Sequence, residues 1–176
     1  FKYTKGNEVI SNATSISQKN NYCAVIYTSG STGQPKGVPI SNINLHNRLQ
    51  WMWSTFPFTA NEVCVAKTSL NFVDHLWEIF GPLLKGIKLV IFSKNTVIDT
   101  VHFIQQLSQH KVSRIVLVPS LLKAVLLHKK LCVEKLSILK EWSCSGEALE
   151  ADLVEKFYAV FNHHRLLNIY GSTEVT

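Results

Sequence analysis

The sequence lacks the features of a fibrous, disordered or membrane-spanning protein. Its 176 residues include only eight glycines and five prolines, and 46% are hydrophobic while 17% are charged. These proportions are typical of a packed globular domain and exclude disorder, collagen and coiled coil. No apolar run approaches the roughly 20 residues that a bilayer-spanning helix needs. We therefore expect a globular protein without a membrane partner.

Cysteine is scarce, and its spacing excludes common metal and redox motifs. The four cysteines, at positions 23, 64, 132 and 144, form no Cys-x-x-Cys pair and adjoin no histidine pair at zinc-finger spacing. This pattern predicts buried, reduced thiols in a cytoplasmic protein. The chain begins without an initiator Met or an apolar secretion signal and ends inside a motif. We expect a piece of a longer protein, truncated at both ends, with residues 1–20 as an uninformative lead-in to 21–176.

The net charge of +6 does not by itself indicate a nucleic-acid partner, because the lysines are scattered along the chain. The densest group has no interleaved aromatic residues. We expect this group to form a solvated helical face; its members are Lys123, Lys129, Lys130, Lys135 and Lys140.

Short apolar runs alternate with longer amphipathic ones, the pattern of βαβ units. The fold class predicted is therefore α/β, with a mostly parallel sheet and flanking helices. A buried strand is expected at 22–27, and further strands at 63–66, 88–92, 114–118, 142–145 and 166–169. Expected helices begin at Ser41 (through 53), cover 72–84, begin at Thr96 (to about 110), begin at Pro119, and cover 151–161, with Gly86 in a turn.

The loop after the first long strand has the composition of a polyphosphate site. Glycines let backbone N–H groups approach an anion, hydroxyls donate further hydrogen bonds, and a lysine adds positive charge. A polar surface turn is the alternative. A Walker loop is excluded, because the lysine precedes the last glycine instead of opening a helix after it. The candidate phosphate-binding residues of this loop are Thr28, Ser29, Gly30, Ser31, Thr32, Gly33, Lys36 and Gly37.

Two further segments follow strands, where ligands of open α/β sheets collect. The last contains Tyr170, Gly171, Ser172, Thr173 and Glu174, and combines a flat ring, a phosphate donor and a carboxylate of the type that Mg²⁺ prefers. Glu174 alone could equally be a first-turn helix acid. The other segment contains Gly146, Glu147 and Ala148, for which a plain strand-to-helix turn with Glu147 as a capping acid is equally consistent.

Together these segments resemble the signature motifs of the adenylate-forming (AMP-dependent) synthetases. The resemblance is to the large N-terminal subdomain of nonribosomal peptide synthetase adenylation domains, and in particular to Ebony-type β-alanyl-amine synthetases. It implies ATP and Mg²⁺ as cofactors, with the first loop on the phosphates, residues 146–148 and 170–172 around adenine, and Lys36, Thr173 and Glu174 in catalysis. Glu174 would help to bind the metal.

The implied reaction is attack of a substrate carboxylate on the ATP α-phosphate, which forms an acyl-adenylate and pyrophosphate. The resemblance also implies transfer to phosphopantetheine on a carrier domain of the same parent chain, outside these residues. The resemblance further implies a small C-terminal domain that brings another lysine to the site. That domain is absent from these residues, so we expect the fragment by itself to be inactive. An acyl-CoA ligase and a non-catalytic nucleotide-binding fragment are alternatives.

Substrate choice is predicted from a one-residue shift. Relatives that activate α-amino acids carry Phe-Asp ahead of Trp-Glu, whereas here Val73 takes the place of that Asp and the carboxylate is at Asp74. A moved carboxylate is expected to follow a moved ammonium, as in β-alanine. An ordinary helix-start acid is the alternative for Asp74. The remaining pocket positions are Trp77, Val116, Ser143, Ser145 and Ile169.

Overall fold

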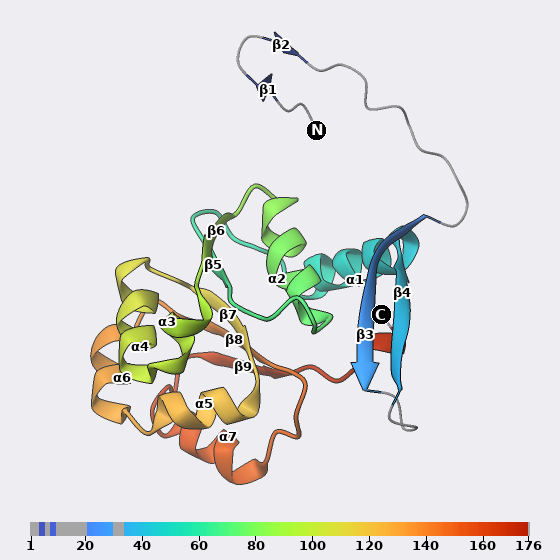
Figure 1. The fold of residues 1–176 in the computed structure, drawn as a ribbon. Helices are drawn as coiled ribbons and strands as arrows, with labels where there is room; N and C mark the ends of the chain where they lie inside the picture. The colour runs from blue at the N-terminus through green and yellow to red at the C-terminus, as the bar shows by residue number, and fades with distance from the viewer. Residues whose placement is uncertain (1–3, 6–7, 10–20, 30–33, 176) are drawn as a thin grey trace.

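The computed structural model describes residues 4–5, 8–9, 21–29 and 34–175. Within these ranges a parallel sheet of five strands in the order β6-β5-β7-β8-β9 carries helices on both faces, as the alternation predicted (Figure 1). Its strands are β5 (Val63–Ala66), β6 (Lys88–Ile91), β7 (Arg114–Leu117), β8 (Glu141–Cys144) and β9 (Arg165–Asn168).

Most helices begin where the sequence predicts. The Ser41 hydroxyl caps the first helix by accepting the Asn44 N–H at 3.1 Å, and Pro119 opens its helix at the first turn. Gly86 turns with a φ of 70°. The helices are α1 (Asn42–Thr55), α2 (Asp74–Leu83), α3 (Lys94–Ile98), α4 (Thr100–Gln109), α5 (Pro119–Leu126), α6 (Lys129–Lys135), α7 (Ala151–Tyr158) and the 3₁₀ helix η1 (Thr173–Val175).

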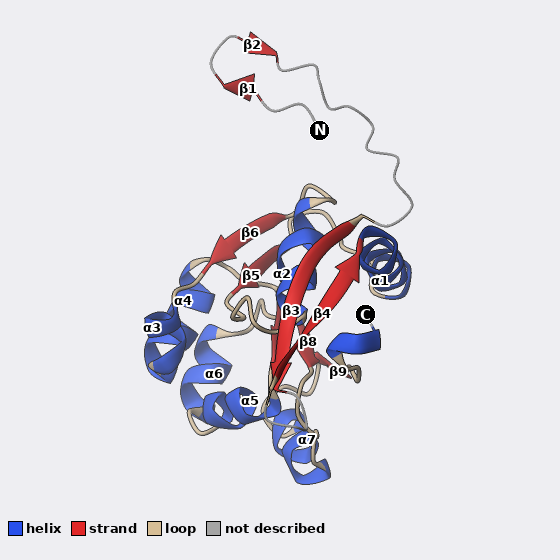
Figure 2. Ribbon diagram, turned by 45° about the vertical axis from the view of Figure 1, so that its right-hand side comes forward, coloured by secondary structure: helices blue, strands red, loops and turns tan. Residues whose placement is uncertain are grey.

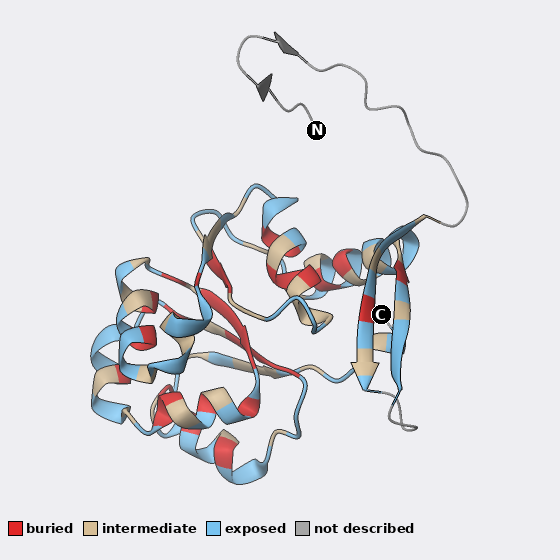
Figure 3. Cartoon of the chain, in the orientation of Figure 1, coloured by how far each residue is buried: buried red, intermediate tan, exposed pale blue. Residues whose placement is uncertain are grey.

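Side chains alternate between the two faces of the sheet because successive strand residues point in opposite directions. Ile115 and Leu117 pack in the larger core with α4 to α7, whereas Val116 between them packs with α1 and α2. Figure 3 shows buried residues concentrated on the central strands and on the inner sides of these helices. The result is three layers, with the sheet in the middle.

The direction of strand addition reverses at β5, which lies between β6 and β7. The chain leaves β5 through α2 to reach β6, and then returns through α3 and α4 to pair β7 on the other side of β5. Right-handed crossovers in opposite directions place their helices on opposite faces. Such a reversal opens a crevice at the carboxyl ends of the strands, which is where ligands of these sheets bind.

The strand predicted at 22–27 is not part of the parallel sheet. It is β3 (Tyr22–Ser29), which pairs antiparallel with β4 (Pro35–Ser41) in a separate hairpin beside α1 (Figure 2). Ile26 and Ile40 are buried against α1 and α2, but Val25 and Tyr27 on the other face are exposed. The expectation of a buried strand was wrong because the apolar run supplies both faces of a hairpin. The short strands β1 (Thr4–Lys5) and β2 (Glu8–Val9) also pair antiparallel.

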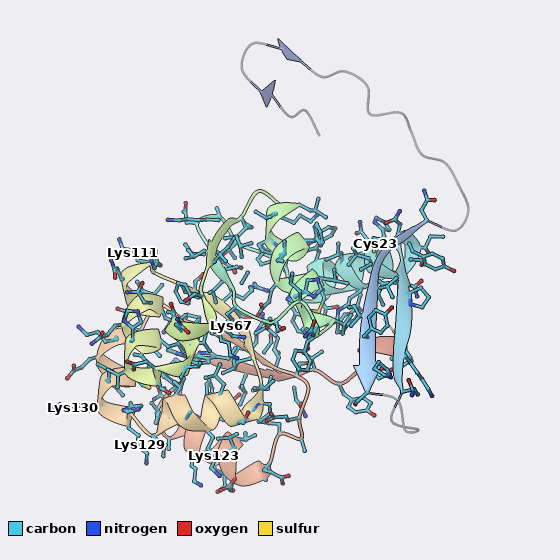
Figure 4. All side chains as sticks on the ribbon, in the orientation of Figure 1. Cys23, Lys67, Lys111, Lys123, Lys129 and Lys130 are labelled. Carbon is cyan, nitrogen blue, oxygen red and sulfur yellow. The ribbon has the colours of Figure 1, made fainter. Side chains whose placement is uncertain are left out.

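Three smaller predictions can be compared directly with the structure. Thr96 does not cap a helix; Ser93 caps α3 and Asp99 caps α4, because the chain bends between two helices. Cys23 is exposed on the hairpin, while the other three cysteines are buried and all four are free. The lysines of the predicted solvated group are all exposed. Figure 4 labels three of them, Lys123, Lys129 and Lys130, on α5 and α6. None of the described helices is long and apolar enough to cross a membrane.

Candidate active site

A cavity of about 340 Å³ opens at the carboxyl ends of β5 and β7, at the point where strand addition reverses. Three predicted pocket residues line it together: Asp74 from the start of α2, Val116 from β7 and Ser145 after β8. They are 29 to 71 positions apart in the chain, yet strand order brings them to one wall. We name this space the acid cavity.

Asp74 is the first residue of α2, where the positive end of the helix dipole favours a carboxylate. Its Oδ1 accepts a hydrogen bond from Nη2 of Arg48 on α1 at 2.8 Å. The two side chains are 19% and 17% exposed, so the pair is largely, but not fully, removed from water. Asp74 therefore faces the acid cavity with one oxygen already held.

The other predicted pocket residues do not line this cavity. Trp77 is buried, stacked on Phe58 and in the same small core as Val116. Ser143 is buried on β8. Val73 packs against Ile26 and Ile40 of the hairpin and does not line the acid cavity. Ile169 lines two neighbouring cavities beside Tyr170 instead.

Sequence reasoning missed the residues that shape the floor of the acid cavity. Lys67 and Thr68 line it directly after β5, and both backbone N–H groups donate to Oε2 of Glu78, at 3.0 and 2.8 Å. The Lys67 ammonium donates to Oε1 of Glu78 at 3.2 Å, and their side chains are only 6% and 1% exposed. Their place after a buried strand was the available signal, and it is the same one that identified Gly146.

A second cavity, of about 330 Å³, lies between residues 146–149 and 168–171. Gly146 and Glu147 line both this cavity and the acid cavity, so the two adjoin. Tyr170 is 99% exposed at its edge, with a free ring face. We name this space the Tyr170 cavity; the flat ring of Tyr170 suits stacking on a planar base.

Glu147 has the capping role that was its alternative, although for a different helix. Its carboxylate accepts the backbone N–H and the hydroxyl of Ser120, both at 2.8 Å, at the start of α5. Gly146 beside it has a φ of 86°, a conformation that side chains rarely adopt. The turn is therefore fixed in place while its backbone stays open to both cavities.

The predicted phosphate loop is the connection between β3 and β4. Thr28 lies opposite Lys36 and Tyr27 opposite Gly37 in the hairpin register. Lys36 is exposed. A Cβ at Gly37 would lie 3.1 Å from Val25, so a larger residue would crowd the hairpin. Gly30, Ser31, Thr32 and Gly33 lie outside the described residues.

Glu174 is exposed on η1, and Figures 1 and 2 place η1 near the hairpin that carries Lys36. A single carboxylate suits Mg²⁺, which retains waters and binds through one or two protein oxygens together with substrate phosphates. In the part of the chain that the structure describes, no group of three or more His, Cys, Asp or Glu side chains could form a closed metal cage.

The buried cysteines near the site are not nucleophiles. Burial raises the pKa of Cys64 and of Cys144, at the end of β8, to about 12 in each case. Both thiols are therefore protonated at neutral pH, and the thiolate is the reactive form.

Comparison with known proteins agrees with this geometry. The chain is 42% identical to the β-alanyl-bioamine nonribosomal peptide synthetase Ebony of Drosophila melanogaster, over 97% of this chain and 20% of that protein. It is 36% identical to tyrocidine synthase 3 of Brevibacillus parabrevis, over 94% of this chain and 2% of that protein. The Vibrio cholerae adenylation domain AlmE, solved with glycyl-adenosine-5'-phosphate, superposes with a TM-score of 0.80 at 26% identity, over 90% of this chain and 30% of that one.

The chain thus spans a small part of each relative. These relatives confirm the resemblance to nonribosomal peptide synthetases and the α/β fold of the adenylation domain that the motifs predicted. The sequence model of the protein family described as AMP-binding enzyme matches residues 2–176 of this chain. This chain belongs to the family of AMP-binding enzymes.

Proposed function

We propose that residues 21–176 are part of an adenylation domain that activates a carboxylic acid with ATP, and that its parent protein transfers the product to phosphopantetheine on a carrier domain. One observation carries the proposal: the acid cavity and the Tyr170 cavity share Gly146 and Glu147 as a common wall. An acid in one and a nucleotide in the other would meet at that wall. This adjacency is what attack of a carboxylate on a phosphate requires.

The residues act by positioning and by offsetting charge. The attacking carboxylate and the α-phosphate are both anionic, so the barrier contains a large electrostatic repulsion. Lys36 and the N–H groups of its loop would offset negative charge on the phosphates, and Thr173 would donate to one of them. Mg²⁺, held in part by Glu174, would supply further positive charge. No covalent enzyme intermediate is needed, in agreement with the protonated thiols of the site.

The acid is proposed to be β-alanine. Asp74 lines the acid cavity while Val73, one residue earlier, points into the hairpin core, so the carboxylate enters the cavity from the shifted position. The apolar wall formed by Val116 and the small side chain of Ser145 suit a short acid. The name of the Drosophila relative, a β-alanyl-bioamine synthetase, supports the same choice.

A cytoplasmic location of the protein stays a prediction.

ATP–pyrophosphate exchange by the parent protein tests the substrate. Exchange with β-alanine should exceed exchange with alanine or glycine by about tenfold to a hundredfold in kcat/KM, because the ion pair in a partly dry cavity depends on amine position. Asp74→Ala should remove most of this preference and affect propionate far less, since propionate has no ammonium. Better exchange with an α-amino acid or a fatty acid than with β-alanine would refute the choice of substrate.

The phosphate-binding residues are tested separately. Lys36→Ala or Glu174→Ala should reduce adenylate formation at least about tenfold through lost charge stabilisation. Both side chains are exposed, so the melting temperature should stay the same. Lys123→Ala, at an exposed lysine far from the hairpin, is the matched control and should leave exchange unchanged (Figure 4). Wild-type exchange in both site variants would place these residues outside the reaction centre.

A further inference from the structure

The ion pair between Arg48 and Asp74 connects the two sides of the site. Asp74 lines the acid cavity, whereas Arg48 lines a third cavity of about 450 Å³ together with Ile169, Tyr170 and Ser172. Their 2.8 Å contact therefore lies between the space proposed for the acid and the loop that follows β9. Arg48 is not among the residues that line the acid cavity.

Arg48 is held on a rigid support. It lies on α1 beside Leu49 and Met52, which are 3% and 2% exposed and anchor that helix in the small core. A guanidinium carried by an anchored helix can fix the side chain that it contacts. Among the described residues, Arg48 is the group that the structure places on the Asp74 carboxylate, through Oδ1 alone. The second oxygen, Oδ2, is left for another cation.

The pair is poorly built for stabilising the fold. The Nε atom of Arg48 is buried and has no hydrogen-bond acceptor in the part of the chain that the structure describes. A buried donor without a partner costs stability, and a buried ion pair often stabilises no better than apolar side chains of similar volume. A stabilising role thus accounts badly for an arginine at this position, whereas a role toward a ligand accounts for its place between the cavities.

We propose that Arg48 is a positioning residue, which holds one oxygen of the Asp74 carboxylate so that the other faces the ammonium of an amino-acid substrate. The proposal rests on the proposed function of the acid cavity. Fixing Asp74 restricts where the ammonium can bind, and so sets how far the substrate carboxylate extends toward the nucleotide. A displacement of the acid by about 1 Å can cost about a hundredfold in rate. Arg48 would act on amine-bearing acids and much less on acids without an amine.

ATP–pyrophosphate exchange by the parent protein with β-alanine and with propionate tests this role. Arg48→Met should reduce kcat/KM for β-alanine by about tenfold or more, mainly through kcat, and that for propionate by less than about threefold. Arg48→Lys keeps the charge without the planar donor group and should recover part of the β-alanine activity. The matched control is Arg165→Met, which removes an arginine–carboxylate pair at the opposite end of the sheet and should lower neither rate.

The outcomes separate the two proposals. Equal losses for β-alanine and propionate in Arg48→Met, or no loss for either, would overturn the role of Arg48 while leaving adenylation intact. If Arg48→Met does not fold, Arg48→Gln provides the same comparison of the two acids. Absence of exchange in the wild-type protein with every acid tested would overturn the proposed function, and the role of Arg48 with it.

Discussion

Replacing Glu78 by Gln should be among the most damaging single changes outside the large core. The Glu78 side chain is 1% exposed, and its carboxylate holds the first two residues after β5. In the variant, the amide oxygen can still accept the backbone N–H groups of Lys67 and Thr68 at the Oε2 position. The amide NH₂ must then face the Lys67 ammonium, which places donor against donor and leaves a buried charge without an anion.

Breaking a buried ion pair in this way costs about 3–5 kcal/mol, and the two retained backbone bonds favour the lower figure of about 3 kcal/mol. Replacing Lys67 by Met removes the unpaired ammonium and should restore much of the lost unfolding free energy. We therefore expect the double variant Lys67→Met/Glu78→Gln to be destabilised by only about 1 kcal/mol. Since Lys67→Met alone also breaks the pair and is itself destabilising, the coupling between the two positions should be at least about 2 kcal/mol.

Urea unfolding of the four proteins in this double-mutant cycle measures the coupling. Asp152→Asn, which breaks the exposed pair of Asp152 with Lys156 on α7, is the control and should not change the unfolding midpoint. Hydrogen exchange at the amides of Lys67 and Thr68 should accelerate in Glu78→Gln, because these N–H groups depend on its carboxylate. Additive effects of the two substitutions, or a Glu78→Gln protein as stable as wild type, would refute this account of the cavity floor.

Two further predictions concern the turn between the cavities and the stability of the fold in acid. Gly146→Ala should destabilise the fold by about 1–2 kcal/mol because of its φ of 86° alone, since the new Cβ would meet Val118 only at an ordinary contact distance of 3.5 Å. Gly171→Ala, with open space around the new Cβ, is the control and should be neutral. Equal unfolding free energies for the two variants would contradict this prediction. Burial, with the nearby positive charge of Lys140, lowers the pKa of His164 to about 4, so its contribution to stability is complete above about pH 6.5 and is lost as the pH falls toward 4. The loss should be on the order of 1 kcal/mol after solvent screening, and His164→Phe should flatten unfolding free energy between pH 6.5 and 4.5; equal slopes for both proteins would contradict the prediction.

Local sequence determined much of the architecture, because its signals act over a few residues. The apolar run at 63–66 became β5 with the bounds predicted, and Ser41, Pro119 and Gly86 mark the helix starts and the turn that their chemistry favours. The same reasoning failed for Thr96, because three residues with capping side chains lie close together and the bend of the chain selected the other two. It also failed at 22–27, where alternation alone could not distinguish a hairpin strand from a buried parallel one.

The site was predictable as a set of motifs but not as a geometry. The rule that ligands collect after strands identified Gly146 and Tyr170, and each lines a cavity. Only tertiary structure could pair Asp74 with Arg48, which lies 26 positions earlier on another helix, or bury Glu78 against the backbone that follows β5. Such contacts depend on strand order and on which face each helix covers, and those are decided by packing of the whole chain rather than by any segment of it.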